Sequence, residues 1–126
     1  MARIALVDDD SSIRRSVSRL LRSLGHECIA YDSAESALAD PCLLQAVCLL
    51  IDIELFGMNG FELRDHLRDL GLSVPHIFVT AHSEADIPDW NTRMGDSFWL
   101  VKPVEEDVLR AAIEKLTPKT DRLPAA

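Results

Sequence analysis

The stretch VCLLID, at positions 47–52, decides the class of fold. Five consecutive apolar residues before a single acid are typical of a strand that is buried on both faces of a parallel sheet. Shorter apolar runs occur at 3–7, 27–31, 76–79 and 98–101. Segments with the helical spacing of apolar residues separate these runs. We therefore predict an α/β fold, in which a five-stranded parallel sheet is covered by helices on both faces.

The predicted helices connect these strands. Apolar periodicity, together with capping and stop residues, predicts helices over 12–24, 33–39, 61–70 and 105–116. Leu70 and Val108 are among the positions assigned to inward faces. Proline is tolerated in the first turn of a helix, so we expect a fourth helix, shorter than two turns, to begin near Ile87 or Pro88 and to end at Gly95.

Composition limits the possible functions. The chain has 126 residues, of which 48% are hydrophobic and 27% charged, and this suits one folded domain, which we place at 1–118 with a tail or linker at 119–126. Its net charge of -8 argues against direct binding to nucleic acid. The sequence has no long apolar run and no signal peptide, so we expect a cytoplasmic protein without a membrane span. The three cysteines lack metal-ligand spacing and are expected to be reduced and mostly buried.

Polar residues follow four of the five predicted strands. They are Asp8 and Asp9 after the first strand, Asp52 after the third, Thr80 after the fourth and Lys102 after the fifth. The carboxyl ends of parallel strands form the ligand-binding edge of an open α/β sheet. One acid at such a place is often a helix cap, as we predict for Asp10. A set of complementary groups on four strands is hard to explain in that way.

These residue types suit phosphoryl transfer to a carboxylate. Asp8, Asp9 and Asp52 would repel one another unless a cation lay between them, and Mg²⁺ (or Mn²⁺) is the expected ion because it needs few carboxylates. Asp52 would then be the nucleophile that forms an aspartyl phosphate. Lys102 would supply a second positive charge, and the Thr80 hydroxyl could donate to the phosphoryl group.

Five segments together resemble the receiver domain of two-component response regulators. They are LVDDD (6–10), LLID (49–52), MNG (58–60), VTAH (79–82) and FWLVKP (98–103). The resemblance extends from residue 3 to about residue 116, and the spacing is nearest to regulators of the nitrogen-fixation and nodulation type. It implies a flavodoxin-like, doubly wound sheet with strand order 2-1-3-4-5. It also implies a bacterial phosphorelay role in which the domain catalyses only its own phosphorylation and dephosphorylation.

The resemblance assigns further roles. Asp9 would be a more direct metal ligand than Asp8, and the backbone carbonyl of Glu54 would be the third protein ligand after Asp9 and Asp52. Thr80 and Trp99 would be the switch pair, although Trp99 could simply pack on the sheet. The bond between Lys102 and Pro103 is expected to be cis.

Partners follow from the same resemblance. The phosphoryl donor would be a sensor histidine kinase or a phosphotransfer protein. The signal would pass to a downstream protein target or to an output domain beyond this chain. The face made by the fourth helix, fifth strand and fifth helix would carry this output, and it could also form a dimer.

Two positions depart from the family pattern. Phe56 stands where the family usually has proline, which leaves the rigidity of that loop in doubt and exposes a ring near the site. Glu54 adds a negative charge that could either strengthen metal binding or repel the phosphoryl donor.

Two alternatives stay open at this stage. A phosphatase of the haloacid-dehalogenase type would use Asp8 as the nucleophile and Asp10 as the acid, but it would leave Asp52 without a role. A receiver fold that is never phosphorylated would act through protein contacts alone.

Overall fold

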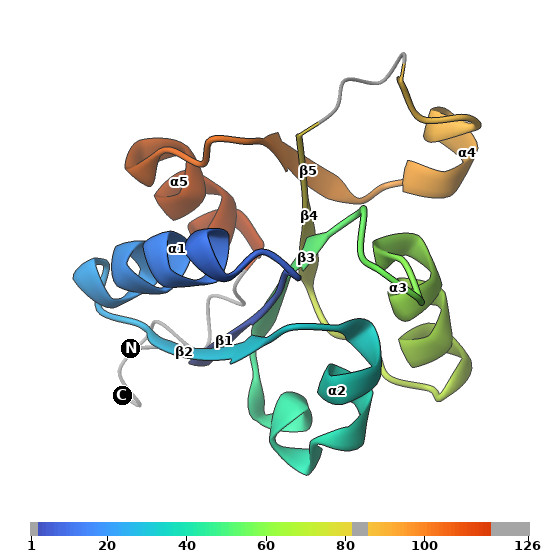
Figure 1. Ribbon diagram of the computed structural model, residues 1–126, viewed down its shortest axis with the longest axis horizontal. Coiled ribbons are helices and arrows are strands. Elements are labelled where there is room, and N and C mark those ends of the chain that lie inside the picture. Colours follow the sequence, from blue (N-terminus) through green and yellow to red (C-terminus); the bar gives the residue numbers. More distant parts are fainter. Residues whose placement is uncertain (1–2, 82–85, 117–126) are drawn as a thin grey trace, which may run out of the picture.

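Five parallel strands form one sheet in the order β2-β1-β3-β4-β5, as predicted. The computed structural model describes residues 3–81 and 86–116, and Figure 1 shows its arrangement. The strands are β1 (Arg3–Val7), β2 (Glu27–Tyr31), β3 (Cys48–Asp52), β4 (His76–Thr80) and β5 (Phe98–Val101). All five residues of β3 are buried, because β3 lies at the centre of the sheet with helices on both sides. The proposed tail at 119–126 lies outside the described residues.

Helices cover both faces of the sheet (Figure 1). They are α1 (Ser11–Ser23), α2 (Ala34–Ala39), the 3₁₀ helix η1 (Pro41–Gln45), α3 (Gly60–Asp69), α4 (Trp90–Met94) and α5 (Glu106–Leu116). Alternate residues along a strand point to opposite faces. In β3, Leu50 accordingly packs in the cluster beneath α1 and α5, whereas Leu49 and Ile51 pack in the cluster that contains residues of α2, α3 and α4.

Side-chain caps set where several helices begin. Asp10 accepts hydrogen bonds from the backbone N–H groups of Ser12 and Ile13 at the start of α1, as expected for a helix cap. Asn59 and Glu62 form a reciprocal capping box at the start of α3. This capping box sets the point at which the loop after β3 ends and α3 begins.

The fourth helix differs from its prediction at one end. It begins at Trp90 rather than at Ile87 or Pro88, because Asp89 has a φ of 57° and its left-handed backbone interrupts the helical conformation. It ends before Gly95, as predicted, and its five residues make fewer than two turns.

Two helix positions and one thiol are more exposed than expected. Leu70 is exposed because α3 ends at Asp69, which leaves Leu70 off the inward face. Val108 is also exposed, because the inward stripe of α5 is centred on Leu109 and Ile113. Of the three thiols Cys48 is buried and Cys28 partly buried, but Cys42 is exposed on η1.

Candidate functional site: an acidic cluster at the strand ends

Three carboxylates meet beyond the ends of β1 and β3. The two strands are neighbours in register, with Val7 beside Ile51, so Asp8 lies next to Asp52. Asp8, Asp9 and Asp52 each offer a carboxylate oxygen, and these three atoms lie within 4.8 Å of one another. Asp8 and Asp52 are only 1% and 5% exposed, whereas Asp9 is open to solvent. The three acids that the sequence placed at strand ends therefore lie together in the structure.

Lys102 places a positive charge in the same cluster. Its Nζ lies 3.0 Å from Asp8 Oδ2 and 3.6 Å from Asp52 Oδ2. The pairing with Asp8 was not predicted, since the sequence indicated Asp8 only as one of the acids around a metal ion, and as a less direct ligand than Asp9. The peptide bond between Lys102 and Pro103 is cis, as expected.

Thr80 lies between the cluster and the edge of the sheet. It is the last residue of β4, it is fully buried, and its backbone carbonyl accepts a hydrogen bond of 2.8 Å from the Lys102 N–H. Any shift of Thr80 is therefore coupled to the end of β5 through its backbone.

Backbone N–H groups orient each of the three carboxylates. Asp8 Oδ1 accepts from the N–H of Asp10 at 2.9 Å, and Asp52 Oδ1 accepts from the N–H of Glu54 at 3.2 Å. Asp9 Oδ2 accepts from the N–H of Phe56, also at 3.2 Å. Such bonds restrict the rotamers of the carboxylates, so the cluster is arranged before any ligand binds.

Arg14 supports the cluster from outside it. Its guanidinium donates to the backbone carbonyl of Asp8 at 2.7 Å. This contact was not predicted from the sequence. The only signal for it was an arginine in the first turn of a helix that directly follows the acids.

Burial and like charge change the ionisation of Asp52. Loss of solvent, followed by repulsion from Asp8, raises the pKa of Asp52 to about 6, although Lys102 acts in the opposite direction. Burial alone would lower the pKa of Lys102, but its contacts with Asp8 and Asp52 outweigh that effect and raise the pKa above its ordinary value. The site therefore favours a positive charge and carries excess negative charge.

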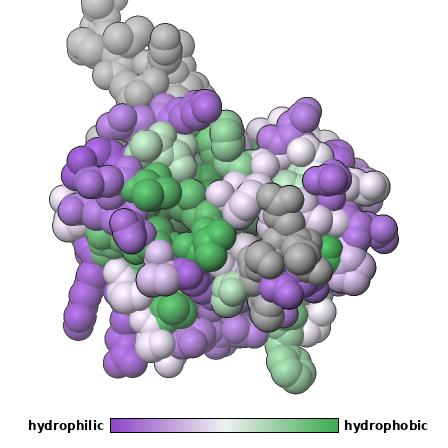
Figure 2. Space-filling model, turned by 90° about the horizontal axis from the view of Figure 1, so that it is seen from above, coloured by the Kyte–Doolittle hydropathy of each residue, from purple (hydrophilic) through white to green (hydrophobic). Residues whose placement is uncertain are grey.

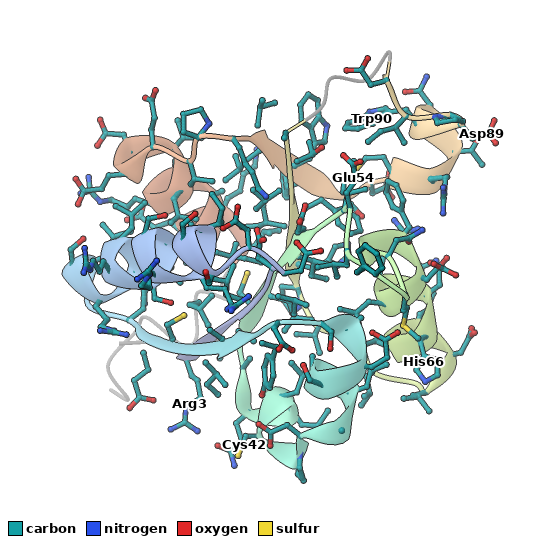
Figure 3. The ribbon with its side chains drawn as sticks, in the orientation of Figure 1. Arg3, Cys42, Glu54, His66, Asp89 and Trp90 are labelled. Atoms are coloured by element: carbon teal, nitrogen blue, oxygen red, sulfur yellow. The ribbon has the colours of Figure 1, made fainter. Side chains whose placement is uncertain are left out.

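The donor set fits a hard divalent cation. All three side chains offer carboxylate oxygens, which are the ligands preferred by Mg²⁺ and Ca²⁺ rather than by softer metals. Asp8, Asp9 and Asp52 are the group with ligand spacing found within residues 3–81 and 86–116. Glu54 lies on the loop that follows β3, and its side chain is exposed (Figure 3).

Trp99 and Phe56, the two aromatic residues to which the sequence pointed, differ in their burial. Trp99 is partly buried on β5, and its ring makes an edge-to-face contact with Trp90 of α4, with centroids 5.0 Å apart. Phe56 is 90% exposed on the loop after β3, as the sequence suggested.

Comparison with known proteins gives the family. The sequence matches the response regulator receiver domain over residues 4–114. The chain belongs to this family. It is a signalling family rather than a class of conventional enzymes, which argues against the phosphatase alternative.

The receiver domain is similar in sequence to curated regulatory proteins of bacteria. The chain is 31% identical to Nodulation protein W of Bradyrhizobium diazoefficiens over 92% of its own length and 51% of the relative's. It is 30% identical to the transcriptional regulatory protein FixJ of Rhizobium meliloti, over 89% and 55% of the two lengths. The chain thus spans about half the length of these curated relatives. Their names agree with the predicted likeness to nodulation and nitrogen-fixation regulators.

Solved structures agree with the fold. The chemotaxis protein CheY4 of Vibrio cholerae is 26% identical, with a TM-score of 0.80 over 92% of this chain and 98% of that one. The response regulator StyR is 32% identical, with a TM-score of 0.80 over 97% and 62%. Within the described part of the receiver domain, no helix is long and apolar enough to cross a membrane.

Proposed function

We propose that Asp52 is the phosphoacceptor of this receiver domain. One observation carries the proposal: Asp52 is buried at a strand end, close to the Asp8 and Asp9 carboxylates and to the Lys102 ammonium. An Asp52 oxygen attacks phosphorus, the bond from phosphorus to the donor nitrogen or oxygen breaks, and the donor leaves with that electron pair. A sensor histidine kinase or a phosphotransfer protein is the proposed donor.

Asp9, Asp52 and the backbone carbonyl of Glu54 would hold Mg²⁺ (or Mn²⁺), with Asp8 acting through water and through Lys102. When bound, the ion supplies positive charge that stabilises the phosphoryl oxygens in the transition state. Lys102 would move from the acids toward the phosphoryl group, and the Thr80 hydroxyl would donate to it. The exposed side chain of Glu54 adds negative charge on the loop that follows β3.

The proposed output surface is the face formed by α4, β5 and α5. On this face, the side chain of Trp99 would change its position when Thr80 shifts toward the phosphoryl group. Val101 of β5 and Val108 of α5 are among the exposed large apolar side chains, and Figure 2 shows that apolar side chains gather on part of the face seen from above. The face would contact a downstream protein, an output domain or a second copy of the chain. We assign residues 1–118 to the receiver domain and place it in the cytoplasm.

The test is phosphorylation by a small donor. The protein is incubated with Mg²⁺ and acetyl phosphate or phosphoramidate, and its intact mass is measured over time. We expect one phosphoryl group to be added, at Asp52, and we expect Asp52→Asn and removal of Mg²⁺ each to abolish the addition. Asp69→Asn, on the exposed end of α3, is the matched control. Labelling of Asp52→Asn at the wild-type rate would contradict the assignment, because another residue would then accept the phosphoryl group. No labelling of the wild type would favour the alternative in which the fold acts only through protein contacts.

A further inference from the structure

The loop between β3 and α3 carries two groups of the proposed site. It supplies the carbonyl of Glu54, and the N–H of Phe56 donates to Asp9. Proline cannot make this bond because it lacks an N–H group. The presence of Phe56 therefore adds a hydrogen bond to Asp9 and removes the restriction on φ that a proline would impose.

A carboxylate on another helix replaces part of that restriction. Glu35 lies in the first turn of α2, and its Oε2 accepts a hydrogen bond of 3.0 Å from the N–H of Met58, which is 23 residues away in sequence. This bond lowers the pKa of Glu35, so the carboxylate is ionised at neutral pH. Bonds that involve a charged acceptor are stronger than those between neutral groups.

Gly57 permits this approach. Its φ is 77°, and a Cβ added there would lie 2.7 Å from Glu35 Oε2. The two bonds therefore hold the loop on either side of one glycine: Asp9 holds it at Phe56, and Glu35 holds it at Met58. The inner part of the loop is held separately, because Leu55 is buried in the core and the Gly60 N–H donates to the Ile53 carbonyl at 2.9 Å.

We infer that Glu35 is a positioning residue for the phosphorylation site, which fixes the outer part of the β3–α3 loop so that Phe56 can orient Asp9. This inference rests on the proposed function and extends it to a residue outside the acidic cluster. Loss of the Glu35 bond frees the loop around Gly57, and the carboxylate of Asp9 then loses its fixed orientation. Metal binding weakens although every ligand is still present.

The experiment compares Glu35→Ala with Glu35→Gln in the whole chain. Gln keeps an oxygen that can accept from Met58 but removes the charge. Hydrogen exchange of the Phe56 and Met58 amides is measured without metal, and the Mg²⁺ dissociation constant is measured by calorimetry. We expect Glu35→Ala to speed exchange at both amides and to raise the dissociation constant about 3- to 10-fold, the usual effect of one lost hydrogen bond. Glu35→Gln should stay within about 2-fold of wild type.

One control isolates the cause. Asp69→Ala removes a remote charge from the exposed end of α3 and should bind Mg²⁺ like wild type. Unchanged exchange at Phe56 and Met58 in Glu35→Ala would overturn the inference, and so would equal weakening by Gln and Ala, which would show a charge effect alone. If the wild type binds no Mg²⁺, the proposed function fails, while the metal-free exchange rates still decide whether Glu35 holds the loop.

Discussion

Asp52 combines two properties that oppose each other in the free protein. Its carboxylate must be ionised to act as a nucleophile, yet its burial next to Asp8 makes the ionised form costly. A cation between the acids removes that cost. The same arrangement that suits phosphoryl transfer therefore destabilises the metal-free fold, and the cost can be measured as stability.

We predict that Asp52→Asn stabilises the metal-free protein at neutral pH. The pKa of Asp52 is about 6 in the folded state, above the ordinary carboxyl value of about 3.9 in the unfolded chain. Between these values the folded state binds more protons than the unfolded state, so stability falls as pH rises, and the full penalty is present above about pH 6. The gain for Asp52→Asn should be about 1–2 kcal/mol at pH 7.5 and should vanish near pH 4.

Urea unfolding with EDTA at several pH values tests this prediction. Asp69→Asn is the control, and it should show no such change across the same range. Parallel stability curves for wild type and Asp52→Asn would show that the charge on Asp52 carries no penalty.

Lys102 compensates the charge of the acids when no metal is bound. Asp8 is 1% exposed and its Oδ2 pairs with Lys102 at 3.0 Å. Removal of one partner from a buried ion pair leaves the other charge uncompensated. We predict that Lys102→Met lowers the free energy of unfolding by about 2–4 kcal/mol in EDTA, and that Mg²⁺ restores more stability to this variant than to wild type.

Two further variants test this role of Lys102: a substitution of another lysine, and a double variant that also removes the charge of Asp8. Lys115→Met removes a lysine that lies over the exposed ring of Phe98, and it should change stability by less than about 1 kcal/mol. Asp8→Asn in the Lys102→Met background should recover part of the loss. A Lys102→Met protein as stable as wild type in EDTA would rule out this role for Lys102.

The sequence located these side chains better than it located their contacts. Strand ends in a parallel sheet must meet at one edge, so the positions of Asp8, Asp52 and Lys102 followed from the pattern of strands. The pairing of Asp8 with Lys102 and the reach of Glu35 across 23 residues did not follow, because both depend on side-chain rotamers and on how separate elements pack.

At the scale of the elements, α3 is placed by the absence of a side chain at its first residue. A Cβ on Gly60 would lie 2.6 Å from the backbone carbonyl oxygen of Asp52 and 2.9 Å from Cα of Ile53. Both neighbours are backbone atoms at the end of the central strand, so they cannot move away cheaply. The close approach brings α3 against the strand that carries Asp52.

We predict that Gly60→Ala destabilises the fold by about 2 kcal/mol or more and slows phosphorylation of Asp52 by acetyl phosphate. The clash is steric, because Gly60 does not have a positive φ. Gly25→Ala is a useful comparison: it has open space around the site but a φ of 89°, so it tests backbone strain without a clash near Asp52. Denaturant unfolding and mass spectrometry measure the two effects, and equal phosphorylation rates in Gly60→Ala and Gly25→Ala would contradict this explanation.

The strands and most helices were predicted well, including the six-residue helix α2 with its Ser33 cap, whereas the start of α4 and the 3₁₀ helix η1 were not. The strands and the helices α1, α3 and α5 have enough apolar residues for the period to identify them. The start of α4 was misplaced because it depends on the left-handed backbone at Asp89, and η1 was not predicted because 3₁₀ turns leave little pattern. Gly95 did mark the end of α4, since its φ of 57° with ψ of -129° suits glycine alone.

Across the whole molecule, the site and the proposed output face meet at one edge of the sheet. β5 is the edge strand, and α4 beside it has five residues (Figure 1). A helix that short depends on packing, which here includes the edge-to-face contact between Trp90 and Trp99. The face is also directly connected to the acidic cluster. Thr80 at the end of β4 pairs with Val101 of β5 in register, and its carbonyl accepts a hydrogen bond from the N–H of Lys102.

We predict that a beryllofluoride mimic of the phosphoryl group changes tryptophan emission and hydrogen exchange in residues 86–102. The mimic adds acceptor atoms at Asp52 that attract the Thr80 hydroxyl, and the shift of Thr80 gives Trp99 room to turn away from Trp90. The emission change should be lost in Asp52→Asn, which cannot bind the mimic in the same way. It should be smaller in Trp90→Phe, which keeps the site but removes one ring of the pair. If emission is constant and exchange changes only along α1 or α2, the signal leaves this domain by another face.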